Sequence, residues 1–231
     1  MSKNETICIN GYEHLLYRQP TAYTEAEMLQ RSKFFYEWLD KRRSVRTFSD
    51  KPVPKDVIEN LLLSASTAPS GANKQPWTFC AVSNAALKSK IREAAEAEEK
   101  LSYESRMSEQ WKNDLAHLGT NMHKPFLETA PWLIIVFKKN FDFDKNGGKL
   151  PNYYVNESVG IACGLLITAI HNAGLATLPY TPGPMNFLNK ILERPSNERV
   201  YIVLPVGYAH DKTYVPDIHR KKIDQFVFFY E

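Results

Sequence analysis

Hydrophobic residues recur at helical spacing in several long stretches of the chain. The first stretch begins at Thr24, where the order T-E-A-E places Glu27 three positions after a threonine and predicts a helix with a capping box. Hydrophobic residues then fall on one stripe as far as Leu39. The basic residues 41–43 follow, and cations stabilise the C-terminal end of a helix. We therefore predict a helix that runs from residue 24 to about residue 41.

Three further helical stretches follow along the chain. The helix predicted after Pro54 has an inner face formed by Val57, Ile58, Leu61, Leu62 and Ala65. Residues 85–117 are charged and favour helix, and this stretch is long enough for two helices. Residues 156–175 are apolar nearly all round, with small residues at intervals, which is typical of a core helix that other backbones approach closely.

Shorter apolar runs predict strands at 77–82, 132–137 and 201–206. The run at 132–137 is unbroken and β-branched, which favours a central strand buried on both faces. Residues 141–152 are polar and read as a surface loop. Because few strands are separated by long helical stretches, the pattern favours an α+β fold with a mixed central sheet flanked by helices.

The two ends of the chain differ from the part between them. Residues 1–23 show no period and form an N-terminal arm, whereas residues 24–215 form one domain. Residues 216–231 end in IDQFVFFYE, an aromatic, strand-like tail too apolar to lie exposed on a monomer. We predict that a second copy covers it, so that the C-terminal extensions cross over in an intertwined homodimer.

Composition excludes several function classes. The chain has 231 residues and a net charge of +3, which is too small to indicate a nucleic-acid surface. Its three distant cysteines fit neither a disulfide framework nor a zinc pair, and a reducing cytoplasm is expected. No stretch reaches the length of a signal peptide or of a membrane span. Metal-ligand spacings and phosphate-loop motifs are also missing, so no metal site is expected.

Two basic segments are candidates for binding a phosphate. If residues 42–46 are extended, Arg42, Ser44 and Arg46 lie on one face and present two guanidinium groups and a hydroxyl. On spacing alone, a solvated basic helix end is the more common explanation for such a run. The cluster around Arg220 has the same two interpretations.

Two other candidates are equally open when taken alone. The turn at 69–73 follows a helix and could offer backbone N–H groups to a cofactor, although ordinary loops often have this composition. Glu99 and Tyr103 are spaced i, i+4 and project from one helix face, but such pairs are usually surface pairs.

The combination of these segments resembles a known family. R-R-S-V-R-x-F from residue 42, A-P-S-G-A-N-K-Q-P-W at 68–77, N-A-G-L at 172–175 and L-P-V-G-Y at 204–208 are similar to motifs of the nitroreductase superfamily of FMN proteins. Within that superfamily, E-x-x-x-Y from Glu99, T-N-x-x-K at 120–124, E-T-A-P at 128–131 and V-P-D-x-x-R-K at 215–221 resemble the iodotyrosine deiodinase branch. The resemblance extends from about residue 25 to the end of the chain.

The resemblance implies a set of cofactor ligands. Residues matching the ligands of the FMN phosphate and ribityl chain are Arg42, Arg43, Ser44 and Arg220. Arg46 would lie near the polar edge of the flavin ring, and Pro69, Ser70 and Gly71 would lie against the ring. Thr181 matches the hydroxyl donor to the flavin nitrogen that accepts a hydride, a contact that favours one-electron chemistry.

The resemblance also implies a substrate site. Residues matching Glu99, Tyr103 and Lys124 belong to a lid, here at about 92–125, that grips the ammonium and carboxylate groups of a halotyrosine or of tyrosine. Lys124 precedes Pro125, which favours a helix end and suits a closing segment. The backbone N–H of Ala72 would hold the phenolate. Binding, tautomerisation to a keto form and two single-electron transfers would then expel halide.

The activity implied by the resemblance is FMN-dependent reductive dehalogenation of halotyrosines, with NAD(P)H or a separate reductase as electron donor. Two alternatives remain at this stage: an NAD(P)H-dependent nitro- or quinone reductase, and a non-catalytic flavin-binding protein. Animal deiodinases have an N-terminal membrane anchor that this sequence lacks, so a soluble, bacterial-type relative is expected. Pro179 and Tyr180 would also bring a proline and a bulky aromatic ring close to the flavin.

Overall fold

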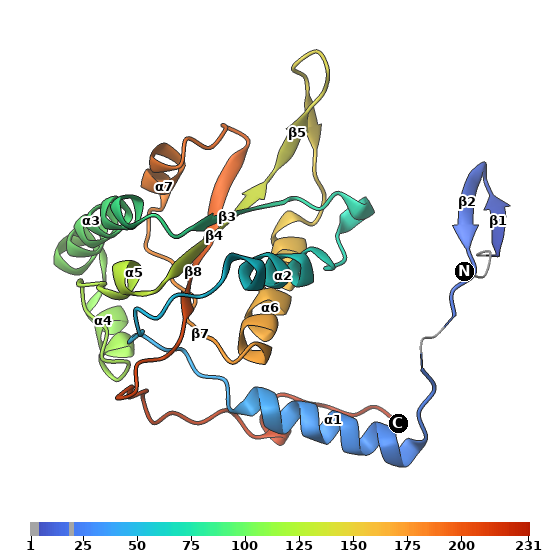
Figure 1. Cartoon of the computed structure of the whole chain (residues 1–231), viewed down its shortest axis with the longest axis horizontal. Coiled ribbons are helices and arrows are strands. Elements are labelled where there is room, and N and C mark those ends of the chain that lie inside the picture. The colour runs from blue at the N-terminus through green and yellow to red at the C-terminus, as the bar shows by residue number, and fades with distance from the viewer. Residues whose placement is uncertain (1–4, 19–20) are drawn as a thin grey trace. The chain divides into compact units, whose positions relative to one another are not determined.

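The computed structural model describes residues 5–18 and 21–231 of the chain (Figure 1). It divides into two units, residues 1–42 and residues 43–231. No helix of the described residues is long and apolar enough to cross a membrane.

The first unit contains a small hairpin and one helix. Strands β1 (Thr6–Ile9) and β2 (Tyr12–Leu15) pair antiparallel around a turn at Asn10-Gly11, whose φ angles are 51° and 83°. Asn-Gly favours this turn because both central residues need positive φ. The sequence interpretation of 1–23 as an arm without a period missed this hairpin, and residues 1–4 and 19–20 of the arm lie outside the described part.

Helix α1 (Glu25–Asp40) confirms the first predicted helix. The backbone N–H of Glu27 donates to Thr24 Oγ1 over 3.3 Å, and that of Thr24 donates to Glu27 Oε2 over 2.8 Å. Both halves of the predicted capping box are thus present.

The second unit is built on a four-stranded sheet in the order β3-β4-β8-β7. The strands are β3 (Trp77–Val82), β4 (Trp132–Lys139), β7 (Ala176–Thr177) and β8 (Glu198–Gly207), and each neighbouring pair is antiparallel. A parallel bridge between Ser44 and Thr177 adds the segment after residue 43 to the β7 edge and makes the sheet mixed. The predicted central position of 132–137 is confirmed, since β4 is buried from Leu133 to Phe137.

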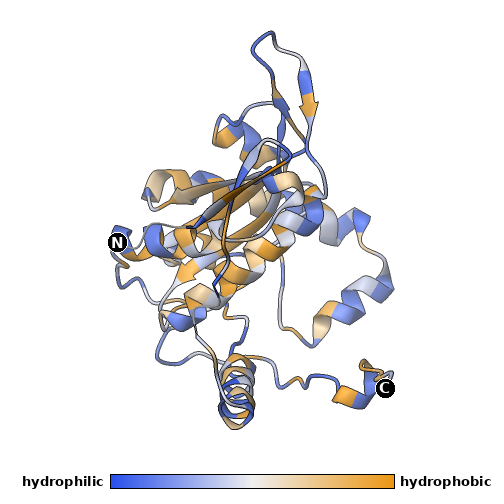
Figure 2. Ribbon diagram, turned by 90° about the vertical axis from the view of Figure 1, so that its right-hand side faces the viewer, coloured by the Kyte–Doolittle hydropathy of each residue, from blue (hydrophilic) through white to orange (hydrophobic). Residues whose placement is uncertain are grey.

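Helices cover both faces of this sheet. Ile134 and Val136 of β4 pack with α2 (Lys55–Ser66) and α6 (Val155–Asn172). The alternate residues Leu133, Ile135 and Phe137 pack on the other face, against α3 (Ala85–Leu101), α5 (Phe126–Thr129) and α7 (Asn186–Ile191). Figure 2 shows the hydrophobic residues concentrated in these layers. The predicted α+β class is confirmed.

Two segments differ from the sequence interpretation. Residues 141–152, expected as a loop, contain the hairpin of β5 (Phe141–Phe143) and β6 (Lys149–Pro151). The tail 216–231 contains no strand; its regular structure is the short 3-10 turn η3 (Ile223–Gln225). The tail's aromatic residues are exposed in the isolated chain. Among the described residues of the second unit, none covers them, so their burial would need another surface.

Candidate functional site

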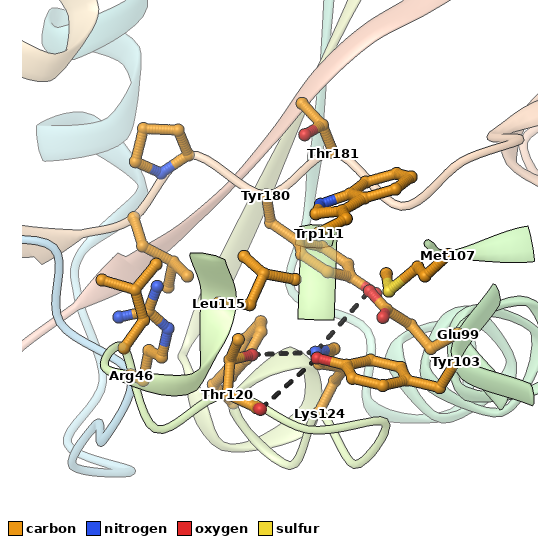
Figure 3. Close-up of a pocket in the computed structure, with 14 residues that line it drawn as sticks. Arg46, Glu99, Tyr103, Met107, Trp111, Leu115, Thr120, Lys124, Tyr180 and Thr181 are labelled. Atoms are coloured by element: carbon orange, nitrogen blue, oxygen red, sulfur yellow. Dashed lines mark hydrogen bonds and ion pairs between the residues drawn. The ribbon is translucent and has the colours of Figure 1, made fainter. Parts of the chain in front are cut away.

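A cavity of about 200 Å³ lies beside the ends of α3 and α4 (Glu109–Ala116) in the second unit (Figure 3). Five of the residues that the sequence singled out line this cavity: Arg46, Glu99, Tyr103, Lys124 and Thr181. The apolar part of the wall is formed by Met107, Trp111, Leu115, Leu118, Phe126 and Leu178. Charged and hydroxyl groups therefore meet an apolar wall, as in many small-molecule sites.

Two of the polar side chains come from the last turn of α3 and from the π-turn η2 (Ser102–Arg106) that follows it. Glu99 lies on α3 and Tyr103 lies in η2. Ser102 Oγ donates to the carbonyl of Gly183 over 3.2 Å, which ties η2 to the segment that carries Thr181. The Tyr103 hydroxyl donates to the carbonyl of Thr120 over 3.3 Å. π-turns inside helices occur frequently at functional sites.

Glu99 and Lys124 form a buried ion pair in the cavity. Lys124 Nζ lies 3.6 Å from Glu99 Oε1, and the two side chains are only 4% and 11% exposed. Lys124 Nζ also donates to Thr120 Oγ1 over 3.1 Å and to the carbonyl of Asn121. Burial lowers the pKa of Lys124, and the Glu99 charge opposes that shift. Since an unpaired buried charge is costly, each of these side chains depends on the other.

The backbone of Lys124 is held by α3 as well. Its N–H donates to Glu96 Oε1 over 2.6 Å. Glu96 in turn accepts from Arg92 over 2.8 Å, and Arg92 also donates to Glu128 over 2.7 Å. Residue 124 is therefore attached to α3 through its backbone and through its side chain, although it is distant from α3 in sequence.

The predicted phosphate ligands are only partly brought together. Ser44 pairs with Thr177, and the N–H of Val45 donates to the Thr177 carbonyl over 3.2 Å, so the segment is extended as expected. The Arg43 guanidinium donates to the carbonyl of Pro216, at the start of the tail that carries the exposed Arg220. Arg42 is the last residue of the first unit.

The turn at 69–72 lies elsewhere in this chain. The Gly71 N–H donates to Ser158 Oγ, over 3.3 Å, in the first turns of α6. A Cβ at Gly71 would lie 2.8 Å from the carbonyl oxygen of Tyr153, so the close approach requires glycine. Ala72 has φ 49°, an unusual left-handed conformation for alanine that is typical of functional turns.

The position of this turn separates it from the phosphate-binding candidates. The turn contacts the N-terminal end of α6, whereas Ser44 lies beside Thr177, beyond the C-terminal end of that helix. A helix of 18 residues is about 27 Å long. None of Pro69, Ser70, Gly71 and Ala72 lines the cavity. One chain therefore does not bring the two groups of predicted flavin ligands together.

Comparison with known proteins agrees with the sequence motifs. The nitroreductase family model matches residues 39–208. An iodotyrosine deiodinase of Haliscomenobacter hydrossis is 57% identical over 195 residues, which is 84% of this chain and 88% of that protein. Iodotyrosine deiodinase 1 of Rattus norvegicus is 49% identical over 92% of this chain and 75% of its own length.

The chain belongs to the nitroreductase family, in its iodotyrosine deiodinase branch. A crystal structure of oxidised iodotyrosine deiodinase bound to FMN and 3-iodo-L-tyrosine matches this fold with a TM-score of 0.73 and 33% identity, over 84% of this chain and all of the other. The family resemblance and the fold class predicted from the sequence are thus confirmed.

Several cavity residues could not be found from sequence alone. Met107, Trp111 and Leu115 sit in a charged stretch that predicted only helices, and their orientation toward the cavity depends on tertiary packing. Tyr180 was noticed only as a bulky neighbour of the flavin, yet it forms part of the cavity wall next to Glu99.

We expect Glu99→Gln to destabilise the ligand-free protein at neutral pH, by about 3 kcal/mol, because Lys124 would remain buried without an anionic partner. A lysine whose pKa is lowered in the folded state opposes folding while it is protonated there. The destabilisation should therefore shrink as pH rises from the lowered pKa toward the ordinary lysine pKa of about 10.5. Denaturant unfolding of both proteins at pH 7 and pH 9.5 measures this difference, and a penalty that is independent of pH would contradict it.

Proposed function

We propose that the protein is an FMN-dependent oxidoreductase that reductively removes halide from halotyrosines. The buried Glu99–Lys124 ion pair beside Tyr103 carries this proposal, because a cavity that holds both signs of charge suits the zwitterionic end of an amino acid. A related deiodinase bound to FMN and 3-iodo-L-tyrosine supports the same ligands for this chain.

The side chains around the cavity fit FMN. Arg46 lies on the extended segment that also carries Arg43 and Ser44, so cationic and hydroxyl donors suited to a phosphate and a flavin edge follow one another. Among the described residues, no ion-pair partner is found for Arg46, and burial lowers the pKa of its guanidinium. The electron-rich edge of a bound flavin would supply the acceptor that the Arg46 guanidinium lacks. When bound, FMN supplies the reducing electrons.

The residues of the cavity would bind the substrate by exchanging partners. Glu99 accepts the ammonium group of the amino acid, Lys124 receives its carboxylate, and the Tyr103 hydroxyl bridges the two. Because Glu99 and Lys124 are already desolvated against each other, the ligand replaces an existing ion pair and does not create a new buried charge. The apolar wall packs against the halogenated ring. An uncharged phenol offers no such exchange.

The reaction replaces a carbon–halogen bond with a carbon–hydrogen bond, so two electrons and one proton enter and halide leaves. Thr181 lines the cavity next to Tyr180, whose backbone is bridged to Val203, and the Thr181 hydroxyl would donate to the flavin. The backbone N–H of Ala72 would donate to the phenolate oxygen of the substrate. It would thereby stabilise the ionised phenol, which is the form that is protonated at the ring carbon. Electrons reach the site from NAD(P)H or from a separate reductase.

A homodimer would complete the site. The turn that carries Ala72 and the segment that carries Ser44 lie at opposite ends of α6, so one flavin can meet both only if they belong to different chains. Apolar residues exposed on α2 and α6 support an interface there; Leu63 is 64%, Ile161 46% and Leu165 37% exposed. In this arrangement residues 24–215 form the body of each subunit, residues from about 92 to 125 form the lid, and residues 216–231 form the extension to the partner.

A cytoplasmic location fits the free cysteines.

The direct test follows iodide release by the flavin-loaded protein, reduced anaerobically with dithionite, from 3-iodotyrosine and from 2-iodophenol. We expect rapid conversion of 3-iodotyrosine to tyrosine and little reaction of the phenol, because only the amino acid engages both charges of the cavity. Flavin binding without iodide release, together with rapid oxidation of added NAD(P)H, would favour a nitro- or quinone reductase. Flavin binding without turnover of any acceptor would favour a binding protein.

Lys124→Ala should weaken 3-iodotyrosine binding at least tenfold while FMN remains bound, because the ligand carboxylate loses a buried charge-assisted partner. Flavin fluorescence quenching measures the affinity. Lys88→Ala is the matched control, since Lys88 is also a buried lysine on this layer but donates to the carbonyls of Glu128 and Ala130, outside the cavity. It should lower stability and leave affinity unchanged. Equal affinity losses in the two variants would remove Lys124 from the site.

Two variants that are defective alone should complement each other if the site spans two chains. Ala72→Trp blocks the turn, and Lys124→Ala disables the cavity at low substrate concentration. After co-expression and random pairing, about half of the dimers contain one chain of each variant. Each mixed dimer has one intact site of its two, so about a quarter of wild-type turnover should return. No recovery in a preparation shown to contain mixed dimers would indicate that both groups act within one chain.

A further inference from the structure

Tyr180 is a buried residue of the cavity wall and precedes Thr181 in the chain. It is 7% exposed, and its ring packs edge-on against Phe126 with ring centroids 5.5 Å apart. Its backbone pairs with Val203 in both directions, N–H to carbonyl, over 2.9 Å each. The side chain is therefore held in one place by the sheet edge and by α5.

The hydroxyl of Tyr180 is the unusual part of this residue. The oxygen is buried and, within the part of the chain that the structure describes, makes no hydrogen bond of acceptable geometry. Figure 3 shows the ring extending toward the Glu99 carboxylate. Burial, followed by the charge of Glu99 and the closeness of its carboxylate to the hydroxyl, raises the pKa of Tyr180, so this phenol stays protonated and has a proton to donate. Buried hydroxyls in native proteins nearly always have a partner.

The other charged groups around this hydroxyl do not provide that partner. Lys124 Nζ lies 5.8 Å from the centroid of the Tyr180 ring and is engaged by Glu99, Thr120 Oγ1 and the Asn121 carbonyl. The Tyr103 hydroxyl is already donating to Thr120, and Glu96 is engaged by Arg92 and by the Lys124 backbone. Glu99 is left as the acceptor, but without a ligand its Oε1 pairs with Lys124.

We propose that Tyr180 is a positioning residue for the amino-acid end of the substrate, acting through Glu99. When the ligand carboxylate draws Lys124 away, the Tyr180 hydroxyl donates to one Glu99 oxygen, and the other oxygen accepts from the ligand ammonium group. A carboxylate accepts several hydrogen bonds at once, and a fixed donor restricts its rotation. The Tyr180 hydroxyl therefore has no hydrogen-bond partner among the described residues without ligand and gains one when the ligand binds. This inference rests on the proposed function, because it needs a zwitterionic ligand.

Tyr180→Phe removes only this hydroxyl and provides the test in the flavin-loaded protein. We expect the dissociation constant of 3-iodotyrosine, measured by flavin fluorescence quenching, to rise about tenfold. The melting temperature without ligand should stay the same or rise, because no hydrogen bond is lost. A purely structural tyrosine would give the opposite result, a lower melting temperature with unchanged affinity.

Tyr201→Phe is the matched control, since the Tyr201 hydroxyl donates to the Asn156 carbonyl over 3.4 Å, away from the cavity. It should leave 3-iodotyrosine affinity unchanged. An affinity loss as large in Tyr201→Phe as in Tyr180→Phe would overturn the role of Tyr180 at the amino-acid end. If wild type binds 3-iodotyrosine and Tyr180→Phe binds it equally well, this inference fails alone. If wild type does not bind it, the proposed function fails.

Discussion

The ion pair between Glu99 and Lys124 is the interaction on which the candidate site depends. Each side chain is nearly buried in a cavity with an apolar wall, and the effective cost of burying one ion is several kcal/mol. The attraction between the two charges offsets that cost when the protein folds. A ligand that carries both charges can then enter by exchange, whereas a ligand with one charge leaves one buried ion without a partner and an uncharged ligand offers no exchange.

The rest of the fold holds this pair in place. α3 contributes Glu99 to the ion pair and Glu96 to the backbone of residue 124, so residue 124 and α3 form one hydrogen-bonded unit. On the other side, the sheet fixes Tyr180 and Thr181 through the bridge to Val203. Tyr180, beside the ion pair, and Thr181, the proposed flavin contact, are consecutive residues of this segment. The position of the 69–72 turn at the far end of α6 explains why such a site would need two chains.

Much of the fold could be predicted from the sequence because its signals are local. The capping box at Thr24 and the unbroken apolar run in β4 each need only neighbouring residues to be recognised. The two hairpins were missed, since their strands have three or four residues and carry too little periodicity to separate them from loops. Asn10-Gly11 was the one available signal for the first of them. The tail has strand-like composition, but it has no strand partner within its own chain.

The site was predictable only in part, for a related reason. Glu99, Tyr103 and Lys124 were recognised together through family motifs, while their spacing alone favoured a surface pair. The inward direction of Trp111 and the unpartnered hydroxyl of Tyr180 follow from tertiary contacts that no periodicity shows. The separation of Ser44 from Ala72 also depends on the path of α6, which the sequence motifs do not encode.

The most direct measurement of the central claim compares 3-iodotyrosine with two analogues that each lack one charge, 3-iodotyramine without the carboxylate and N-acetyl-3-iodotyrosine without the ammonium group. Each dissociation constant is measured by quenching of the bound flavin's fluorescence at one pH and ionic strength. If the ligand replaces both members of the Glu99–Lys124 pair, both analogues bind at least tenfold more weakly than the amino acid. Binding of either analogue as tightly as 3-iodotyrosine would contradict an exchange that requires both charges.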